Sequence, residues 1–442
     1  MSLQRGRAFA DDDETQIDRS IFSDPVLYRQ EIGRVFARSW LFLAHESQFH
    51  KPGDFHSTYM GTDPVIVVRQ KDGSYKVLLN SCRHRGMRVC RYDSGNAKAF
   101  TCSYHGWAYA TDGSLLSVPD ETAAYGEGLD HSAWGLATAP RVETYKGLIF
   151  ATWDPEIPPL VEYLGDFTYY LDVLVDPDEE GCSVATGVHR WRMQGNWKLA
   201  AEQFAGDMYH AASTHLSAFI AEAPHSKGIR PPERGFQAGV DGGHGLGGYA
   251  AYPYWQSQGF SPEVEDWMGA FWERAAQRLG RARTTDAVFI HGTCFPNLSL
   301  LFNRWHLRVW HPKGPDSMEV HSWSLLPNSA PPAVRRALLL DYQRHFSASG
   351  TWEQDDSEQW NYSTNSNDGF ITAKLPLHYG MGAGRGPNKG FPEFPGTVDT
   401  VYSEINQRGF YRRWSELMAV PHPAEPTTGE APVTGSAKAV IA

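Results

Sequence analysis

The chain has 442 residues, a formal net charge of −11 and a sequence pI of about 5.9. This length exceeds what one compact core usually holds, so we expect two domains. The negative charge argues against nucleic acid or an anionic membrane surface as a partner. The sequence has no apolar signal segment and no uninterrupted apolar run of roughly 18 residues, so we expect a cytoplasmic protein.

The first elements in chain order indicate an inserted domain. Asp24-Pro25 places an N-cap before a proline at the first helical position, which predicts a helix over 24–39. Short strand-like runs separated by Asp-Gly turns then predict a small antiparallel β domain over 41–154. A cluster of prolines from Pro155 onward marks its end. We therefore place this domain between a helical N-terminal part, 1–40, and a larger domain, 155–420.

The larger domain mixes helices and strands. Periodicity predicts helices over 196–216 and 334–346 and strands over 295–302, 307–310 and 318–325. The fold class we predict is α+β, with an antiparallel β domain inserted into a domain whose central antiparallel sheet is flanked by helices. Residues 224–248 are rich in Gly and Pro without periodicity, which predicts a long lid-like loop. The tail 421–442 has the composition of a disordered segment.

Two short motifs in the β domain pair a cysteine with a histidine. Cys82 and His84 form Cys-x-His, and Cys102 and His105 form Cys-x-x-His. A Rieske [2Fe-2S] centre needs two thiolates for one iron and two imidazoles for the other. A structural zinc also uses two cysteines and two histidines, but its ligands usually pair cysteine with cysteine and histidine with histidine. The mixed pairs therefore favour a Rieske cluster, and the other three cysteines are expected to be reduced thiols.

A second set of metal-ligand candidates lies in the larger domain. Asp207, His210 and His215 follow one another within the predicted helix. Two histidines and one carboxylate form the facial triad of non-haem iron enzymes, which leaves coordination positions open for O2. The histidines are five residues apart, so a regular helix must unwind or end between them. We expect the carboxylate within 354–358, which contains two aspartates and a glutamate.

Taken together, these motifs resemble those of a known family. The chain resembles the alpha (large) subunits of Rieske non-haem iron aromatic ring-hydroxylating dioxygenases, the naphthalene and biphenyl dioxygenase group, over nearly its whole length. The matching segments, in chain order, are Cys82-Arg83-His84-Arg85-Gly86-Met87, Cys102-Ser103-Tyr104-His105-Gly106-Trp107, Asn196-Trp197-Lys198, Asp207-Met208-Tyr209-His210 with His215, and Glu353-Gln354-Asp355-Asp356.

The resemblance implies roles for individual residues and partners. It implies Asp356 as the third ligand of a mononuclear Fe(II) beside His210 and His215. Asp207 then becomes the carboxylate that bridges the iron site to the Rieske cluster of a neighbouring subunit, where it meets His105. The family also implies a homotrimer of this chain, a ferredoxin and reductase as electron donors and, in many members, a small beta subunit that completes an alpha3beta3 hexamer.

The reaction that fits two such sites is cis-dihydroxylation of an aromatic substrate with O2 and electrons from NAD(P)H. A pure electron carrier would need only the β domain, and a zinc hydrolase would leave the cluster without a purpose. The main alternative is a Rieske monooxygenase that hydroxylates or demethylates an aromatic acid, because such enzymes share every metal ligand. The side chains of the pocket must separate these two functions.

Residues that flank the ligands are the candidates for a substrate pocket. Most of them are apolar or aromatic and none is Lys or Arg, which favours an uncharged, hydrocarbon-like arene. Arg283 or Arg304 would overturn this preference if its side chain pointed inward. Lys198 and Glu202, at i and i+4, are predicted to form a surface pair. The predicted pocket residues are Gln203, Phe204, Met208, Ala211, His291, Phe346, Thr351 and Trp352.

Overall fold

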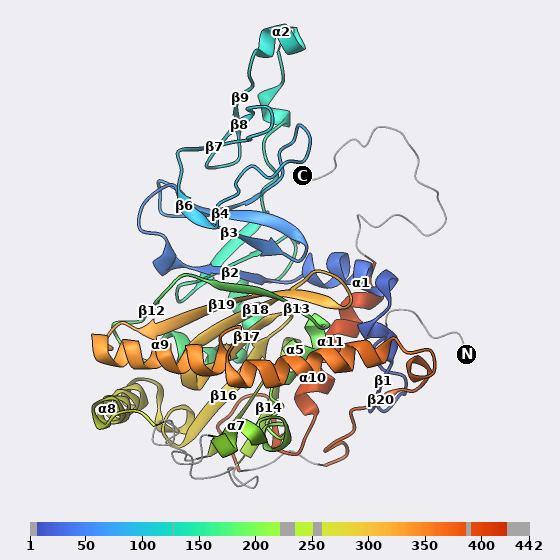
Figure 1. Cartoon of the computed structure of the whole chain (residues 1–442), viewed down its shortest axis with the longest axis vertical. Coiled ribbons are helices and arrows are strands. Elements are labelled where there is room, and N and C mark those ends of the chain that lie inside the picture. Colours follow the sequence, from blue (N-terminus) through green and yellow to red (C-terminus); the bar gives the residue numbers. More distant parts are fainter. Residues whose placement is uncertain (1–6, 127, 222–234, 251–258, 386–389, 422–442) are drawn as a thin grey trace.

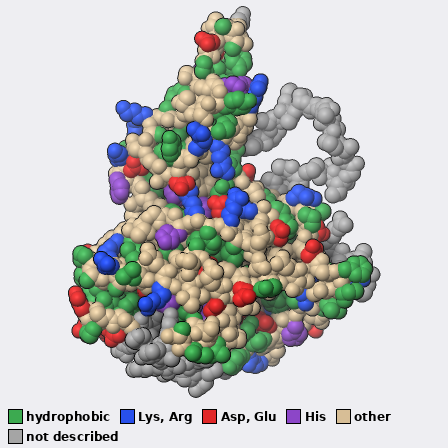
Figure 2. Space-filling model, in the orientation of Figure 1, with side chains coloured by type: hydrophobic (Ala, Val, Ile, Leu, Met, Phe, Trp, Pro, Cys, Tyr) green, Lys and Arg blue, Asp and Glu red, His purple; other side chains and the backbone are tan. Residues whose placement is uncertain are grey.

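The computed structural model describes residues 7–126, 128–221, 235–250, 259–385 and 390–421. The fold has a narrow upper part built from small β-sheets and a broad lower part in which helices cover a large sheet (Figure 1). The space-filling view shows charged side chains of both signs scattered over the face in view (Figure 2). None of the described helices is long and apolar enough to cross a membrane.

Three antiparallel sheets form the upper part. The four-stranded sheet and one of the three-stranded sheets share a core of buried apolar side chains that includes Ile66, Leu78 and Tyr109. Their strands pair in the orders β10-β11-β2, β5-β4-β3-β6 and β7-β8-β9. The strands are β2 (Leu41–His45), β3 (Asp54–Met60), β4 (Asp63–Arg69), β5 (Tyr75–Leu79), β6 (Ser94–Asn96), β7 (Ala99–Thr101), β8 (Ala108–Ala110), β9 (Leu115–Ser117), β10 (Arg141–Tyr145) and β11 (Leu148–Thr152).

The lower part is organised by one antiparallel nine-stranded sheet. Its order is β12-β19-β18-β17-β16-β15-β14-β21, and β13 also pairs with β19. The strands are β12 (Cys182–Val184), β13 (His189–Gln194), β14 (Gly235–Val240), β15 (His244–Ala250), β16 (Ala287–Cys294), β17 (Leu298–Leu301), β18 (His306–Pro312), β19 (Ser317–Pro327) and β21 (Thr397–Thr400). This arrangement confirms the predicted α+β class with a central antiparallel sheet.

Helices cover this sheet. In Figure 1, α9 and α10 cross in front of it, and α8 lies at its lower edge. The longer helices begin at residues that favour a helix start, such as Pro262 and Pro332 at the first helical position. The helices are α1 (Pro25–Glu31), α2 (Glu121–Tyr125), α3 (Leu160–Leu164), α4 (Phe167–Val175), α5 (Trp197–Phe204), α6 (Ala211–Thr214), α7 (Leu216–Ala221), α8 (Pro262–Leu279), α9 (Pro332–Phe346), α10 (Thr351–Asn367) and α11 (Ile405–Ala419).

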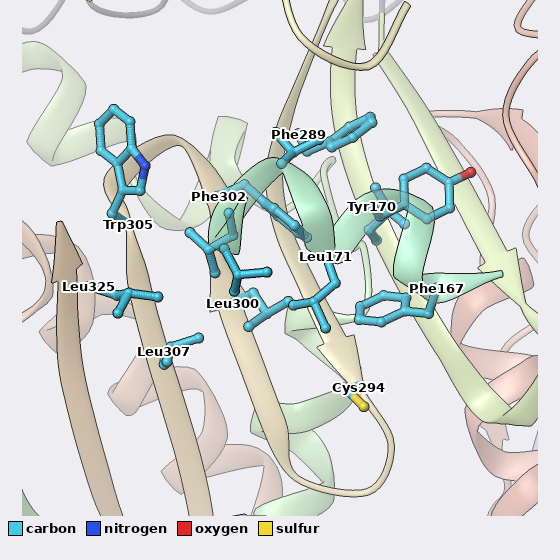
Figure 3. Packing of buried hydrophobic residues seen from close by; sticks show 14 of the residues in the cluster. Phe167, Tyr170, Leu171, Phe289, Cys294, Leu300, Phe302, Trp305, Leu307 and Leu325 are labelled. Atoms are coloured by element: carbon cyan, nitrogen blue, oxygen red, sulfur yellow. The ribbon is translucent and has the colours of Figure 1, made fainter. Parts of the chain in front are cut away.

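The main core lies between the sheet and α4. Figure 3 shows Phe167, Tyr170 and Leu171 of α4 beside Phe289 and Leu300 of the sheet. All five side chains are buried, and the rings of Tyr170 and Phe289 meet edge to face with their centroids 5.1 Å apart. This packing holds the back of the sheet rigid and leaves β16 and β18 as a platform for α5 on the other side.

Several predicted elements differ from the observed ones. The N-terminal helix ends at residue 31 and continues as a π-helical turn over Ile32–Phe36. The predicted loop 224–248 is wrong in its second half, because β14 and β15 occupy Gly235–Val240 and His244–Ala250. Glycine is disfavoured in strands, and this segment has glycine at positions 235, 239, 245, 247 and 248. Strand propensity therefore did not predict β14 and β15. Residues 222–234 and 422–442 lie outside the described residues.

The predicted surface pair of Lys198 and Glu202 is also wrong. Both side chains are buried, and the ammonium of Lys198 lies 2.5 Å from Oε1 of Glu31 in α1. The indoles of Trp197 and Trp414 also donate to the Glu31 carboxylate, at 3.2 and 2.7 Å. A buried charge requires such a partner, and here the partner is 167 residues away in the sequence. This network ties the N-terminal helix to α5 and α11.

Candidate metal centres

The two Cys-His motifs form a matched pair of tight turns at the top of the molecule. In each turn the cysteine amide donates to a carbonyl five residues later, from Cys82 to Met87 and from Cys102 to Trp107, both at 2.8 Å. A glycine amide donates back to each cysteine carbonyl. Gly106 has φ of +77°, and a Cβ there would lie 2.7 Å from Pro119, so only glycine fits.

The side chains of these turns fit an iron–sulfur cluster. Cys82 and Cys102 are buried and are not joined in a disulfide. The rings of His84 and His105 lie with their centroids 4.5 Å apart, and Trp107 stacks on His84. Nδ1 of His84 is buried without a hydrogen-bond partner among the described residues, which is unusual for a polar atom. The buried cysteines, the neighbouring imidazoles and the unpartnered Nδ1 of His84 fit the ligand set of such a cluster.

The second set of candidates converges in the lower part. Among the described residues, His210, His215 and Asp356 are the one group of candidate ligands whose ligand atoms all lie within 4.8 Å of one another. Nε2 of His210 lies 3.3 Å from Nε2 of His215, and Oδ1 of Asp356 lies 3.5 and 3.4 Å from these two nitrogens. These spacings suit one ion about 2.0–2.2 Å from each atom.

Local sequence explains how two histidines five residues apart come together. The helix α5 ends at Phe204, and Gly206 then adopts φ of +133°. A Cβ at residue 206 would lie 2.1 Å from the amide nitrogen of Asn406, so the chain turns closely against α11. His210 and His215 then flank the short helix α6 as its N-cap and C-cap. The predicted helix over 196–216 is therefore broken, but before His210 and not between His210 and His215 as predicted, because α6 occupies the residues between them.

Each histidine is oriented by an acceptor at its Nδ1 atom. Nδ1 of His210 lies 2.5 Å from the carbonyl oxygen of Asp207 and 3.5 Å from the Asp207 carboxylate. Nδ1 of His215 lies 3.2 Å from Oδ2 of Asp355. When Nδ1 carries the ring hydrogen, Nε2 keeps a lone pair that can bind a metal ion held between the three ligands. Burial lowers the pKa of His210, but the carboxylates of Asp207 and Asp356 outweigh it and raise that pKa to about 9.

Gln203, on α5, contacts two of the three candidate ligands. Its Nε2 donates to Oδ1 of Asp356 at 2.7 Å and lies 3.4 Å from Nε2 of His210. The indole of Trp360 in α10 donates to Oε1 of Gln203 at 2.8 Å, which fixes the amide orientation. Sequence analysis did not identify Trp360 as a site residue, because nothing in the sequence around it indicates that its indole bonds to Gln203.

Most predicted pocket residues lie around this triad. The ring of His291 is 6.1 Å from that of His210, and Trp352 stacks on His215 at 5.2 Å. Phe204, Met208 and Phe346 are buried, and Ala211 is partly buried beside His210. Thr351 departs from this set. Its side chain is exposed, and its hydroxyl donates to the carbonyl of Arg344 in α9.

Two arginines were not included among the pocket candidates. Arg304 lies over Trp352 and Phe346, 5.0 and 5.3 Å from their ring centroids, and Arg308 lies 5.6 Å from the centroid of Phe204. Both are buried in ion pairs, Arg304 with Asp341 at 2.9 Å and Arg308 with Glu353. Arg283 pairs instead with Asp172 and stacks on Tyr169.

Comparison with known proteins agrees with this arrangement. Residues 182–419 match the model of the ring hydroxylating alpha subunit (catalytic domain) family, and residues 39–145 match that of the Rieske [2Fe-2S] domain. The chain belongs to this family of ring-hydroxylating alpha subunits. The family implies a Rieske cluster and a mononuclear iron, which the two groups of side chains fit.

Individual relatives cover almost the whole chain. It is 44% identical over 414 residues to the biphenyl 2,3-dioxygenase subunit alpha of Rhodococcus jostii (strain RHA1), covering 92% of this chain and 89% of that one. It is also 44% identical to the benzene 1,2-dioxygenase subunit alpha of Pseudomonas putida, covering 93% of each. A solved naphthalene 1,2-dioxygenase variant bound to phenanthrene superposes with a TM-score of 0.86 at 32% identity, covering 93% of this chain and 94% of that one.

Proposed function

We propose that this protein is the terminal oxygenase subunit that cis-dihydroxylates a neutral aromatic hydrocarbon. The observation that carries the proposal is the convergence of His210, His215 and Asp356 in a chain that also holds a Rieske motif. In this proposal His210, His215 and Asp356 would hold a mononuclear iron that would supply the activation of O2, and Cys82, His84, Cys102 and His105 would hold the cluster that would supply electrons. The protein itself orients the ligands.

The charge balance around the site supports a neutral substrate. Burial raises the pKa of Asp341, but Arg304 and His345 outweigh it and lower that pKa to about 2, so Asp341 is a carboxylate. Arg304 is thus already neutralised and does not serve a substrate carboxylate. Burial and the neighbouring His210 lower the pKa of His291 to about 4, so His291 is uncharged as well. Beyond the ligands themselves, these groups offer the carboxylate of an aromatic acid no ionic partner, and burying an unpaired charge costs free energy.

The separation of the two centres supports a multisubunit enzyme. Within one chain the cluster turns lie near the top and the triad lies in the lower body (Figure 1). We therefore propose a homotrimer in which Asp207 meets His105 of a neighbour and carries electrons onward. A ferredoxin and a reductase would reduce the cluster, and a beta subunit would complete a hexamer. The domain boundaries at 41–154 and 155–420 and a cytoplasmic location are part of the same proposal.

The test is turnover of the purified protein with donor proteins under 18O2. Naphthalene, biphenyl and benzene are offered beside their carboxylated analogues, and products are analysed by mass. We expect a cis-dihydrodiol of a neutral arene that contains two labelled oxygens. With a mixture of 16O2 and 18O2, both oxygens of one product molecule should carry the same isotope. A phenol or a demethylated acid with one labelled oxygen would assign the protein to the monooxygenases instead.

A further inference from the structure

Glu202 is a buried carboxyl group that neither metal centre uses. Its side chain lies on α5, eight residues before His210, and 8% of the residue is exposed. The hydroxyl of Tyr379 donates to Oε1 at 2.7 Å. Oε2 is buried without a hydrogen-bond partner among the described residues. The Tyr411 hydroxyl is also close to Glu202, but not in hydrogen-bonding geometry.

Among the described residues, no cation forms an ion pair with this carboxyl group. Lys198, one turn earlier on α5, attracts it but is bound to Glu31. The carboxylates of Asp207 and Glu404 favour its neutral form. A buried carboxylate with one hydrogen-bond donor is unfavourable, so the acid retains its proton. Burial is the main cause that raises the pKa of Glu202 to about 8, and the Tyr379 and Tyr411 hydroxyls limit the rise.

A cavity runs from Glu202 to Gln203 and Asp207, which contact the metal ligands, although none of the three ligands lines it. It has a volume of about 470 Å³, and its lining includes Glu202, Gln203 and Asp207. Gln203 and Asp207 hydrogen-bond to Asp356 and His210 of the triad. At its other end the cavity is lined by exposed side chains, Tyr362 and His378. A polar cavity of this size holds water, which can carry protons between these groups.

The proposed reaction needs protons as well as electrons. One arene, one O2, two electrons and two protons give one cis-dihydrodiol, so each turnover must bring two protons into a buried site. We propose that Glu202 supplies protons to the metal site: its carboxyl group gives a proton to cavity water, which passes a proton to the Asp207 carboxylate beside His210. The resulting Glu202 carboxylate takes a proton back from solvent through the same cavity. This inference rests on the proposed function.

The main variant is Glu202→Gln, which keeps the size and the acceptor for Tyr379 but removes the acid. The infrared spectrum of the resting protein at pH 7 should contain a protonated carboxylic acid band that the variant lacks and that titrates away above pH about 8. Iron content and the cluster spectrum should be unchanged. Product formation should fall by roughly 100-fold, within the range for general acid catalysis, and more of the consumed O2 should leave as hydrogen peroxide.

Two further variants test the proton role apart from the structural one. Tyr379→Phe removes a donor that stabilises the charged form of Glu202, so the alkaline limb of the pH–rate profile should move to higher pH. Glu404→Gln removes a negative charge that favours the neutral form, so that limb should move to lower pH. A purely structural role for Glu202 gives no such opposite shifts.

The outcomes separate this inference from the proposed function. If Glu202→Gln retains the normal product yield per O2 and the normal pH profile, or if the infrared band is absent from the unmodified protein, Glu202 supplies no proton. Should Glu202→Gln fail to load iron, the opposite shifts of the other two variants decide the matter, and unshifted profiles overturn the inference. Failure of the unmodified protein to dihydroxylate any arene would instead overturn the proposed function, while the infrared result would still report the Glu202 acid.

Discussion

The side-chain amide of Gln203 donates a 2.7 Å hydrogen bond to Oδ1 of Asp356, the oxygen that also faces both histidines. This bond connects α5, which precedes the histidines, with α10, which bears the carboxylate. Trp360 holds the other end of the amide. A carboxylate ligand is more strongly fixed when its outer partners are themselves fixed. Gln203 is therefore expected to set the position of Asp356.

Replacing Gln203 by Leu should weaken iron binding without disturbing the cluster. The loss of an outer partner typically lowers metal affinity by about 10–100-fold. The measurement is Fe(II) titration against a competing chelator, with the cluster absorbance as an internal reference. Gln354→Leu is the matched control, because that exposed glutamine on α10 donates only to the Ala348 carbonyl. Asp356→Ala removes a ligand and should empty the site. If the unmodified protein and the three variants bound Fe(II) equally well, Asp356 would not be a ligand and Gln203 would not position it.

The cluster assignment predicts a selective effect of thiol replacement. Cys102→Ser removes one of two thiolates and should abolish the absorbance, the EPR signal of the reduced state and the acid-labile sulfide. Cys90→Ser should retain all three, because Cys90 is a buried cysteine outside both turns whose sulfur lies near Ser57 and the Tyr92 carbonyl. Metal analysis of the unmodified protein gives an independent check. Zinc at full occupancy in the β domain would contradict the Rieske interpretation.

The sequence could predict the metal side chains because each motif is short and chemically distinctive. Cys82 with His84 and Cys102 with His105 are local patterns, but the break in the helix falls before His210, at Gly206, and not between the two histidines as their spacing suggested. The surrounding network could not be predicted, because its partners are far apart in sequence. Lys198 shows this clearly: Glu202 is one turn away, but Glu31 is its ion-pair partner. Arg304 and Asp341 likewise meet only after β18 and α9 pack together.

The buried pair of Lys198 and Glu31 leads to a stability prediction. Lys198→Met leaves the Glu31 carboxylate buried without its cation, which should cost about 3–5 kcal/mol. Adding Glu31→Gln should recover part of this loss, because it removes the unpaired charge and the amide oxygen still accepts from one of the two indoles, which donate to different oxygens of Glu31. Urea denaturation followed by tryptophan fluorescence measures both changes. If the double variant were no more stable than Lys198→Met, the ion pair would not be the source of the loss.

Glu202 should make the stability of the protein depend on pH. Its pKa is about 8 in the folded protein and 4.5 as the ordinary value. Between these values the folded chain retains a proton that the unfolded chain has released, so the Glu202 contribution to stability falls as pH rises. The unfolding temperature of Glu202→Gln minus that of the unmodified protein should therefore increase from pH 5 to pH 8. A difference that stays constant over this range would show that Glu202 ionises normally.

Asp207 offers a test of communication between the two centres. Its backbone carbonyl and carboxylate both lie at Nδ1 of His210, and the proposed trimer brings the same carboxylate to His105 of a neighbour. Asp207→Asn keeps the size and the backbone contact but removes the charge. Both irons should still load, and a ferredoxin should still reduce the cluster. Steady-state turnover should nevertheless fall by orders of magnitude, because the electron path between subunits is interrupted.

A single-turnover experiment identifies the step that is lost. Both centres are reduced in advance, substrate and O2 are added, and cluster oxidation is followed by absorbance while product is measured by quenching. In the unmodified protein the cluster should oxidise as product forms. In Asp207→Asn the cluster should stay reduced, although the iron content matches that of the unmodified protein. If the variant oxidised its cluster at the normal rate, Asp207 would only orient His210, and the electron would cross between subunits by another route.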